Sequence, residues 1–196
     1  MKKIYRKIWE LALPYQDKRD DAGHTKIVTN YALKLCKIEK GDEDAMVPAA
    51  ILHDVGWSQL SKKGRFLIFD HSSTNNEVLG VRCKHQDIGV KIGKKILNKI
   101  NYPKKLTDEI LEIISQHDTR KGFISKNEGL VRDADKLWRF SKTGFKADIK
   151  RNIFTFKYLY NKINKQITEK NFFYSDSAKK IAVEELKNRK REYKNR

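Results

Sequence analysis

Four of the five histidines in this 196-residue chain fall where helices are expected to begin or end. His24 follows a glycine at a helix start, and His53 closes an apolar run. His85 begins a later helical segment, and His117 ends the segment after that. Helix ends in a bundle meet at a common surface, and inward-facing side chains on such helices commonly bind metals. These four imidazoles therefore predict one shared site.

Three aspartates could supply oxygen ligands to the same site: Asp54, which follows His53, and Asp133 and Asp135 in the segment VRDADKLWRF. Neutral imidazole provides nitrogen ligands, and a carboxylate provides a hard anionic oxygen that balances the charge of an ion. No thiolate belongs to the set, which argues against a structural zinc site. The residue types predict a divalent metal site (Mn, Fe, Ni, Zn or Mg; one ion or two) with mixed nitrogen and oxygen ligands.

The adjacent pair His53 and Asp54 constrains the backbone. Neighbouring residues point about 100° apart around a helix, so both side chains can reach one ion only near a helix end. Gly56, two residues further on, is typical of such an end. The dipeptide alone is weak evidence, because a second one occurs at His117-Asp118. The order of the whole pattern is the stronger signal.

Apolar residues recur with helical spacing along most of the chain. A first helix is expected to end at Pro14. Further helices are expected over residues 24–38, 44–54, 85–100, 103–117 and 129–142, near 150–165, and over 176–193.

Residues 56–80 are rich in Gly, Ser, Asn and charge, and we expect an irregular loop over one end of the core. The segment FLIFD at 66–70 is the one strand-like stretch. No repeat or Pro-rich linker marks a second domain. The prediction is an all-α, single-domain helical bundle over residues 1–196.

The composition is that of a globular chain, with 39% hydrophobic residues. No run of roughly 18 apolar residues occurs, so we expect no transmembrane helix and no membrane partner. The start of the chain is a poor secretory signal, because Arg6, Lys7 and Glu10 interrupt its apolar stretch. Cys36 and Cys83 are too few for a disulfide scaffold, so we expect a cytoplasmic protein.

The formal net charge of +18 is concentrated toward the C-terminal end, where residues 150–196 are expected to be helical and basic. A basic surface suits a nucleic acid, and it equally suits a small phosphate-bearing substrate. A third explanation is compositional drift in a genome rich in A and T. No aromatic–basic interleaving typical of a nucleic-acid module accompanies the charge, so the charge alone does not decide among these.

In this combination the chain resembles the HD-domain metal-dependent phosphohydrolases. The resemblance rests on His24, on the pair His53-Asp54 inside AAILHDVGW, on His85 before QDIGVKIGKKIL, on His117 in IISQHD, and on DADKL at 133–137. The closing aspartate of that family usually stands in an Ala-Asp-x-Leu pattern, which favours Asp135 over Asp133. The C-terminal stretch from LYNKINKQI through AKKIAVEELKNRKREY also looks like the tail of small bacterial members, so the resemblance covers nearly the full chain.

The resemblance implies a divalent ion held by His24, His53, Asp54 and Asp135. It also implies hydrolysis of a phosphoester or phosphoanhydride bond, with a nucleotide or related small phosphate as substrate. Some members hold a second ion with histidines equivalent to His85 and His117, whereas others use such positions to contact phosphate.

The proposed chemistry assigns roles to a few further side chains. Asp54 would help to orient and deprotonate the attacking water, and His85 or His117 would protonate the leaving group. Lys84, Arg65 and Lys136 are the basic residues expected to bind the substrate phosphate. His71 is expected to be an ordinary loop residue, and Trp138 stands where relatives with this closing motif often have another aspartate.

Two other functions fit the same residues. The basic C-terminal part would suit a metal-dependent nuclease acting on single-stranded nucleic acid, which would bind oligonucleotides in a salt-sensitive way. A non-catalytic module that senses a nucleotide would keep the site, and ligand would raise its melting temperature without release of phosphate.

Overall fold

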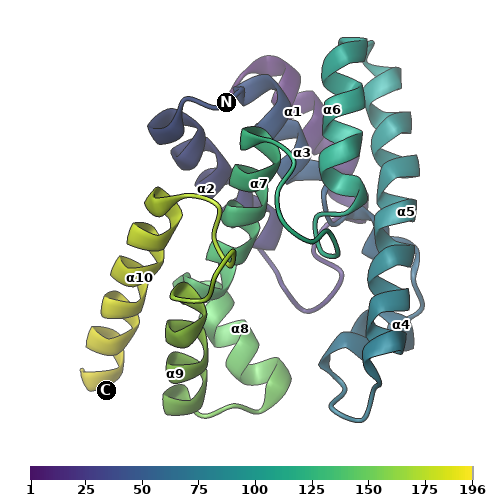
Figure 1. The fold of residues 1–196 in the computed structure, drawn as a ribbon. Coiled ribbons are helices and arrows are strands. Elements are labelled where there is room, and N and C mark those ends of the chain that lie inside the picture. The colour runs from purple at the N-terminus through teal and green to yellow at the C-terminus, as the bar shows by residue number, and fades with distance from the viewer. Residues whose placement is uncertain (196) are drawn as a thin grey trace.

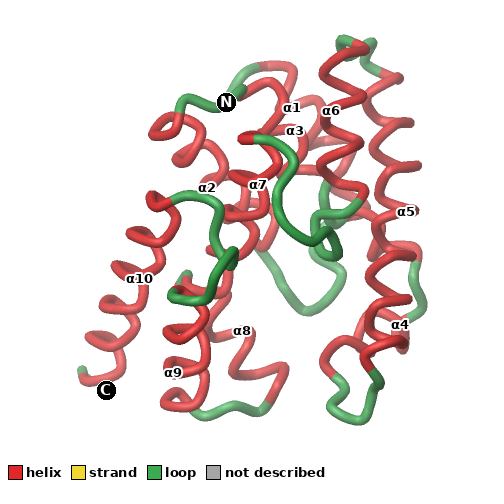
Figure 2. The backbone as a smooth tube through the Cα atoms, viewed as in Figure 1, coloured by secondary structure: helices red, strands yellow, loops and turns green. Residues whose placement is uncertain are grey.

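The computed structural model describes residues 1–195, and within them the fold is all-α, as expected, with no strand (Figures 1 and 2). The α-helices are α1 (Lys3–Ala12), α2 (His24–Glu39), α3 (Glu43–Leu52), α4 (Lys62–Phe66), α5 (Asn75–Lys99), α6 (Lys104–Ser115), α7 (Lys126–Leu137), α8 (Lys142–Asn152), α9 (Phe156–Ile167) and α10 (Asp176–Lys194). Short 3₁₀ turns lie at Leu13–Tyr15, Val55–Gln59, Leu67–Phe69 and Trp138–Phe140. No helix of residues 1–195 is long and apolar enough to cross a membrane.

Helix α3 forms the centre of the bundle. Every residue from Ala45 to Leu52 is buried, as expected of a helix that is apolar on all sides. Helices α1, α2, α6 and α7 pack around it, and α5 and α6 run side by side at one edge of the molecule (Figure 1). Helix α3 ends directly before His53, so the His53-Asp54 pair lies in the interior of the protein.

The 3₁₀ turn after α3 packs directly on α5. A methyl group added at Gly56 would lie 1.8 Å from the carbonyl oxygen of His85 and 2.6 Å from the amide nitrogen of Gly89. Only glycine allows two backbones to approach so closely. This contact sets the His53-Asp54 segment against the part of α5 that carries His85.

A short loop before α2 fixes the start of that helix. The carboxylate of Asp17 accepts hydrogen bonds from the amides of Gly23 (2.7 Å) and Thr25 (3.1 Å) and from the Thr25 hydroxyl (3.0 Å). Gly23 adopts the left-handed conformation with φ of 83°, which is accessible to glycine at little cost. His24 is therefore the first residue of α2, as the sequence predicted.

The expected irregular loop over residues 56–80 is wrong in large part. Helix α4 lies inside it, and α5 begins at Asn75, where Thr74 and Glu77 form a reciprocal capping box. The first turns of α5 extend past the core and are mostly exposed, so they lack the apolar periodicity that marks a buried helix. As a consequence His85 lies in the middle of a long helix and not at the start of a short one.

Two smaller expectations also fail. Residues 66–70 are not a strand, because they form the end of α4 and a 3₁₀ turn. The helix expected near 150–165 is two helices, because α8 ends at Asn152 and α9 begins at Phe156. Between them Ile153 is 92% exposed and has a positive φ of 55°, which breaks the helical path.

We predict that Gly56→Ala destabilises the protein by about 3 kcal/mol or more, because the added methyl group meets backbone atoms that cannot rotate away. Urea unfolding followed by circular dichroism measures this change. Gly80→Ala is the matched control, since Gly80 lies in α5 with open space where its methyl group would stand. That control should gain stability by about 0.5–1 kcal/mol. Equal stability of the two variants would contradict the packing argument.

Candidate metal centre

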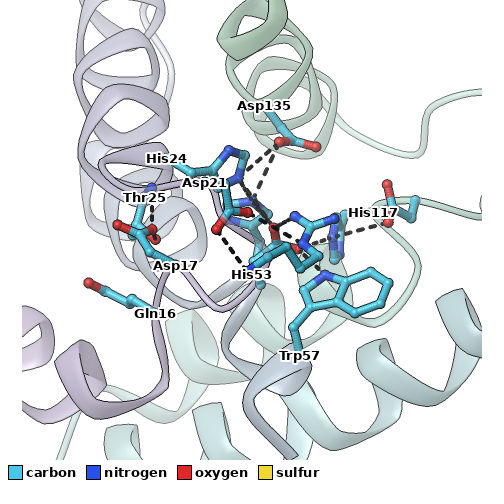
Figure 3. Close-up of polar contacts among 12 residues, drawn as sticks. Gln16, Asp17, Asp21, His24, Thr25, His53, Trp57, His117 and Asp135 are labelled. Carbon is cyan, nitrogen blue, oxygen red and sulfur yellow. Dashed lines mark hydrogen bonds and ion pairs between the residues drawn. The ribbon is translucent and has the colours of Figure 1, made fainter. Parts of the chain in front are cut away.

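Two histidines and two aspartates converge at one point, from the start of α2, the residues directly after α3 and the last turn of α7; Figure 3 labels His24, His53 and Asp135 among them. The Nε2 atoms of His24 and His53 lie 3.0 Å apart. Asp54 Oδ2 lies 3.2 Å from His24 Nε2 and 3.6 Å from His53 Nε2. Asp135 Oδ1 lies 3.4 Å and 3.5 Å from the same two nitrogen atoms. We call these four residues the first cluster; they are the ligand set that the family resemblance implied.

A second cluster lies on the other side of Asp54. His117 Nε2 is 3.4 Å from His85 Nε2 and 3.4 Å from Asp54 Oδ1. Asp118 Oδ2 is 3.6 Å from His85 Nε2 and 4.0 Å from His117 Nε2. The second cluster is thus His85, His117 and Asp118. Oδ2 of Asp54 faces the first cluster, and Oδ1 of the same carboxylate faces the second.

Two of the imidazoles are held in the tautomer that a metal ligand needs. His53 Nδ1 lies 2.9 Å from the carbonyl oxygen of Ala50, and His117 Nδ1 lies 2.9 Å from that of Ile114. A carbonyl oxygen can only accept a hydrogen bond, so each ring carries a proton on Nδ1. In the neutral ring this leaves the Nε2 lone pair directed into the cluster.

The spacing of the donor atoms fits a shared cation. Two ligand atoms each about 2.1 Å from one ion lie about 3.0–3.4 Å apart at right-angled or tetrahedral positions. The separations within the first cluster run from 3.0 to 3.6 Å. Two imidazole nitrogens and two carboxylate oxygens thus face one point at these distances. The residues present therefore fit a divalent ion.

The buried charges of the first cluster stabilise one another. Burial by itself would raise the pKa of Asp54, but the Arg19 guanidinium and His53 hold that pKa well below its usual range. Burial likewise opposes the charged form of His53, yet the carboxylates of Asp54 and Asp135 raise its pKa to about 9. Burial would raise the pKa of Asp135 as well, and His53 with His24 lowers it instead. Both carboxylates are therefore anionic at neutral pH.

The second cluster differs in its electrostatics. Burial, with the neighbouring His117 ring, lowers the pKa of His85 to about 3, so this imidazole is neutral at physiological pH. A neutral imidazole is the form that binds a metal. The His85 ring also stacks on Trp57, with centroids 4.0 Å apart and planes inclined by 15°.

Arg19 and Trp57 hold Asp54 in place. Arg19 Nη2 donates a hydrogen bond to Asp54 Oδ2 within an ion pair, and Trp57 Nε1 donates a 2.9 Å hydrogen bond to Asp54 Oδ1. The Arg19 guanidinium lies 4.4 Å from the centre of a Trp57 ring and also pairs with Asp21. Sequence reasoning missed Arg19, because its loop has no periodic pattern and carries no motif.

Asp118 was not expected among the ligands either. It belongs to the second His-Asp dipeptide, at the end of the α6 segment, and its amide donates a 2.9 Å hydrogen bond to the Gln86 side chain. Asp118 thus stands in the same sequence relation to His117 as Asp54 does to His53. That repeated dipeptide was the signal that could have found it.

The structure separates the two aspartates of the DADKL segment. Asp135 faces the first cluster, whereas Asp133 is fully buried and turned away from it. The Asp133 carboxylate accepts hydrogen bonds from the amides of Tyr174 (2.7 Å) and Ser175 (2.8 Å) and from the Ser175 hydroxyl (2.8 Å). Asp133 therefore anchors the loop that leads into α10, and burial raises its pKa to about 6.

A cavity of about 490 Å³ opens onto both clusters. Arg65 and Lys84 were expected to bind substrate, but neither lines it. Lys84 precedes His85 by one position on α5, about 100° around the helix, and is exposed to solvent. Arg65 lies on the short helix α4, and the residues of this region that line the cavity are Ile68 and Phe69, which follow α4.

Lys136 lines the cavity as expected, although its ammonium group also donates a hydrogen bond to the backbone carbonyl of Phe172. His71, expected to be an ordinary loop residue, lines the cavity as well, with its ring 6.2 Å from that of Phe154. The other cationic side chains in the lining are Arg19, Arg82, Arg132, Arg139, Arg151 and Lys162.

Comparisons with known proteins agree with the all-α fold. The chain is similar to the crystal structure of a predicted HD superfamily hydrolase from an uncultured Thermotogales bacterium, with a TM-score of 0.60 and 18% identity. That likeness covers 97% of this chain and 89% of the other, and at this identity it concerns the fold. Among curated proteins none matches.

Residues 21–139 match the HD domain. The match spans more than half of the chain and includes every residue of the two clusters. The chain therefore belongs to the HD domain family.

Proposed function

We propose that this protein is a metal-dependent phosphohydrolase that cleaves a phosphoester or phosphoanhydride bond of a nucleotide or related small phosphate. One observation carries the proposal: two clusters of metal-binding side chains share the Asp54 carboxylate and face a cavity lined by cationic groups. The first cluster would hold one divalent ion, and the second would hold another. Such ions supply Lewis acidity at phosphate oxygens and lower the pKa of water at the site.

Asp54 would act as the shared ligand. Its two oxygens face different clusters, and Arg19 and Trp57 fix the plane of the carboxylate between them. Asp118 and Asp135 line the cavity with side chains that are 23% and 25% exposed, so both can accept a hydrogen bond from a water in the cavity. These carboxylates would orient the attacking water and take up its proton.

His85 and His117 fit the second ion better than they fit a proton donor. The pKa of His85 is about 3, so this ring holds no proton to give at neutral pH. The Nδ1 proton of His117 is committed to the carbonyl of Ile114, and its Nε2 faces Asp54 and His85. This argues for the metal-ligand role of these histidines over the proton-donor role.

Cationic side chains at the mouth of the clusters would bind the phosphate. Arg82 lies 3.6 Å from Asp118 and Arg19 pairs with Asp54, and both line the cavity. Positive charge there offsets the charge that builds on phosphate oxygens during attack.

The cavity gives little support to the nuclease alternative. That alternative rested on the basic C-terminal part, residues 150–196, of which Arg151 and Lys162 line the cavity while none of the described residues of α10 does. The basic side chains of α10 therefore lie outside the cavity that opens onto the clusters.

The central test is Asp54→Asn. We expect it to abolish phosphate release, with a loss of at least about a thousandfold in kcat/KM, because a neutral amide cannot serve as the shared anionic ligand. Phosphate and pyrophosphate release would be measured with Mn²⁺ on a panel of nucleotides, simple phosphomonoesters and a short oligonucleotide. Asp87→Asn, an exposed position on α5, is the matched control. Full activity of Asp54→Asn in a folded protein would refute the proposal.

Metal content tests the two clusters separately. The wild-type chain should bind two Mn²⁺ ions, and Asp118→Ala should weaken one of them while the other stays near its wild-type affinity, since Asp118 faces only the second cluster. Calorimetric titration of the chelator-stripped protein gives both affinities. A wild-type stoichiometry of one ion would contradict the second site.

The two aspartates of α7 offer a matched pair. Asp133→Ala leaves two backbone amides and a hydroxyl without their acceptor, so the free energy of unfolding should fall by about 2–4 kcal/mol while metal binding persists. Asp135→Ala should abolish binding of the first ion, because Asp135 faces the first cluster, and it leaves the hydrogen bonds of Asp133 to the α10 loop intact. Urea unfolding in chelator and metal titration separate the two. If Asp133 were the metal ligand instead of Asp135, Asp133→Ala would abolish binding of the first ion and Asp135→Ala would leave it in place.

A further inference from the structure

The cavity has a second cationic end that is built mainly by residues following the matched HD segment. At this end the carboxylate of Asp148, on α8, pairs with two guanidinium groups at once. Arg139 Nε lies 2.6 Å from its Oδ2, and Arg151 Nη2 lies 2.6 Å from its Oδ1. The side chain of Asp148 is 5% exposed, so the pairs are shielded from water. The buried carboxylate of Asp148 thus holds two guanidinium groups in place, and the three side chains together carry a net charge of one positive unit.

Arg151 is held by more than this ion pair. Its side chain is only 9% exposed, its Nη1 donates to the backbone carbonyl of Arg19 (3.4 Å), and its guanidinium lies 4.5 Å from the centre of the Phe69 ring. A guanidinium buried beside a shared counter-ion is costly unless a further anion completes the neutralisation. Arg139 is 31% exposed and so remains accessible from the cavity.

An ammonium group adds to the charge of this end. Among residues 1–195 no carboxylate forms an ion pair with Lys162, which lines the cavity and whose Nζ lies 5.1 Å from the centre of the Phe154 ring. Three cationic side chains, those of Arg139, Arg151 and Lys162, therefore accompany a single carboxylate here.

The other end of the same cavity carries several carboxylates beside its cationic groups. There Asp54 pairs with Arg19 and Asp118 with Arg82, while Asp135 adds a third carboxylate near Lys136. An anion that reaches this end needs the divalent ions of the two clusters, whereas an anion at the α8–α9 end needs only protein side chains. Phe69, Phe154 and Phe172 also line the cavity and provide apolar faces.

We propose that the α8–α9 end of the cavity, formed by Arg139, Arg151 and Lys162, binds a second phosphate group of the substrate. The substrate is then an organic bisphosphate: one phosphate reacts at the metal clusters, and the other is held by the guanidinium and ammonium groups, with an apolar or planar body against the phenylalanine rings. The assignment of the first phosphate rests on the proposed hydrolase function. The second phosphate site does not, because protein side chains alone make it.

Binding without metal tests the second site by itself. Calorimetry in chelator would compare adenosine 3′,5′-bisphosphate with adenosine in the wild type and in the variants Arg139→Gln and Lys162→Gln. Each variant should weaken the bisphosphate about tenfold, the effect of one charge-assisted hydrogen bond. Lys165→Gln is the control, because Lys165 is exposed on the same helix as Lys162 and does not line the cavity. Wild-type affinity in both variants would overturn the proposal.

Kinetics with Mn²⁺ then tests whether the site serves the substrate. The wild type should prefer the 3′,5′-bisphosphate to the 5′-monophosphate by at least about tenfold in kcat/KM, and Arg139→Gln and Lys162→Gln should remove most of that preference through KM. Equal losses on both substrates would mean that these cations bind the reacting phosphate, which would overturn the two-phosphate arrangement. Metal-free binding that depends on both residues, with no turnover of any substrate, would leave the second phosphate site standing and refute the hydrolase function.

Discussion

The buried carboxylate of Asp54 is the interaction on which the rest of the site depends. A carboxylate that is 9% exposed is strongly unfavourable unless its neighbours stabilise the charge. Arg19 and Trp57 do so by direct hydrogen bonds, and imidazoles from both clusters face the two oxygens. Each of these groups comes from a different part of the chain. The helices must therefore pack so that several ends and one mid-helix position meet at one anion.

The close approach of the Gly56 turn to α5 makes that convergence possible. Helix α3 is buried along its length, so its end lies in the interior, and α5 passes close enough to bring His85 beside Asp54. A single added methyl group at Gly56 would push these two segments apart. The geometry of the second cluster is thus set by backbone packing, while that of the first is set by the ends of α2 and α3 and the last turns of α7. The two clusters meet at Asp54 but depend on different contacts.

The sequence predicted the parts of the protein that local patterns determine. The all-α fold, the helix start at His24 and a helix end close to the His53-Asp54 pair follow from periodicity and glycine placement. The long α5 was misjudged because its first turns are exposed and carry no apolar stripe. Of the cationic residues that line the cavity, Lys136 was predicted from the sequence and the others were missed, because among many lysines and arginines only tertiary packing decides which ones face it. Arg19 reaches Asp54 through a loop fixed by Asp17 and Asp21, and no local pattern shows that.

The two ends of the cavity come from separate parts of the chain. All donors of the two clusters lie within residues 21–139, whereas Asp148, Arg151 and Lys162 follow that segment. Metal-binding geometry tolerates little change, because its ligands must keep their mutual distances. The helices α8 and α9 supply no donor atom to the two clusters, although Arg151 donates a hydrogen bond to the backbone carbonyl of Arg19. In the proposed arrangement, the second phosphate site therefore lies mainly on the helices that follow the matched segment, whereas the metal clusters lie within that segment.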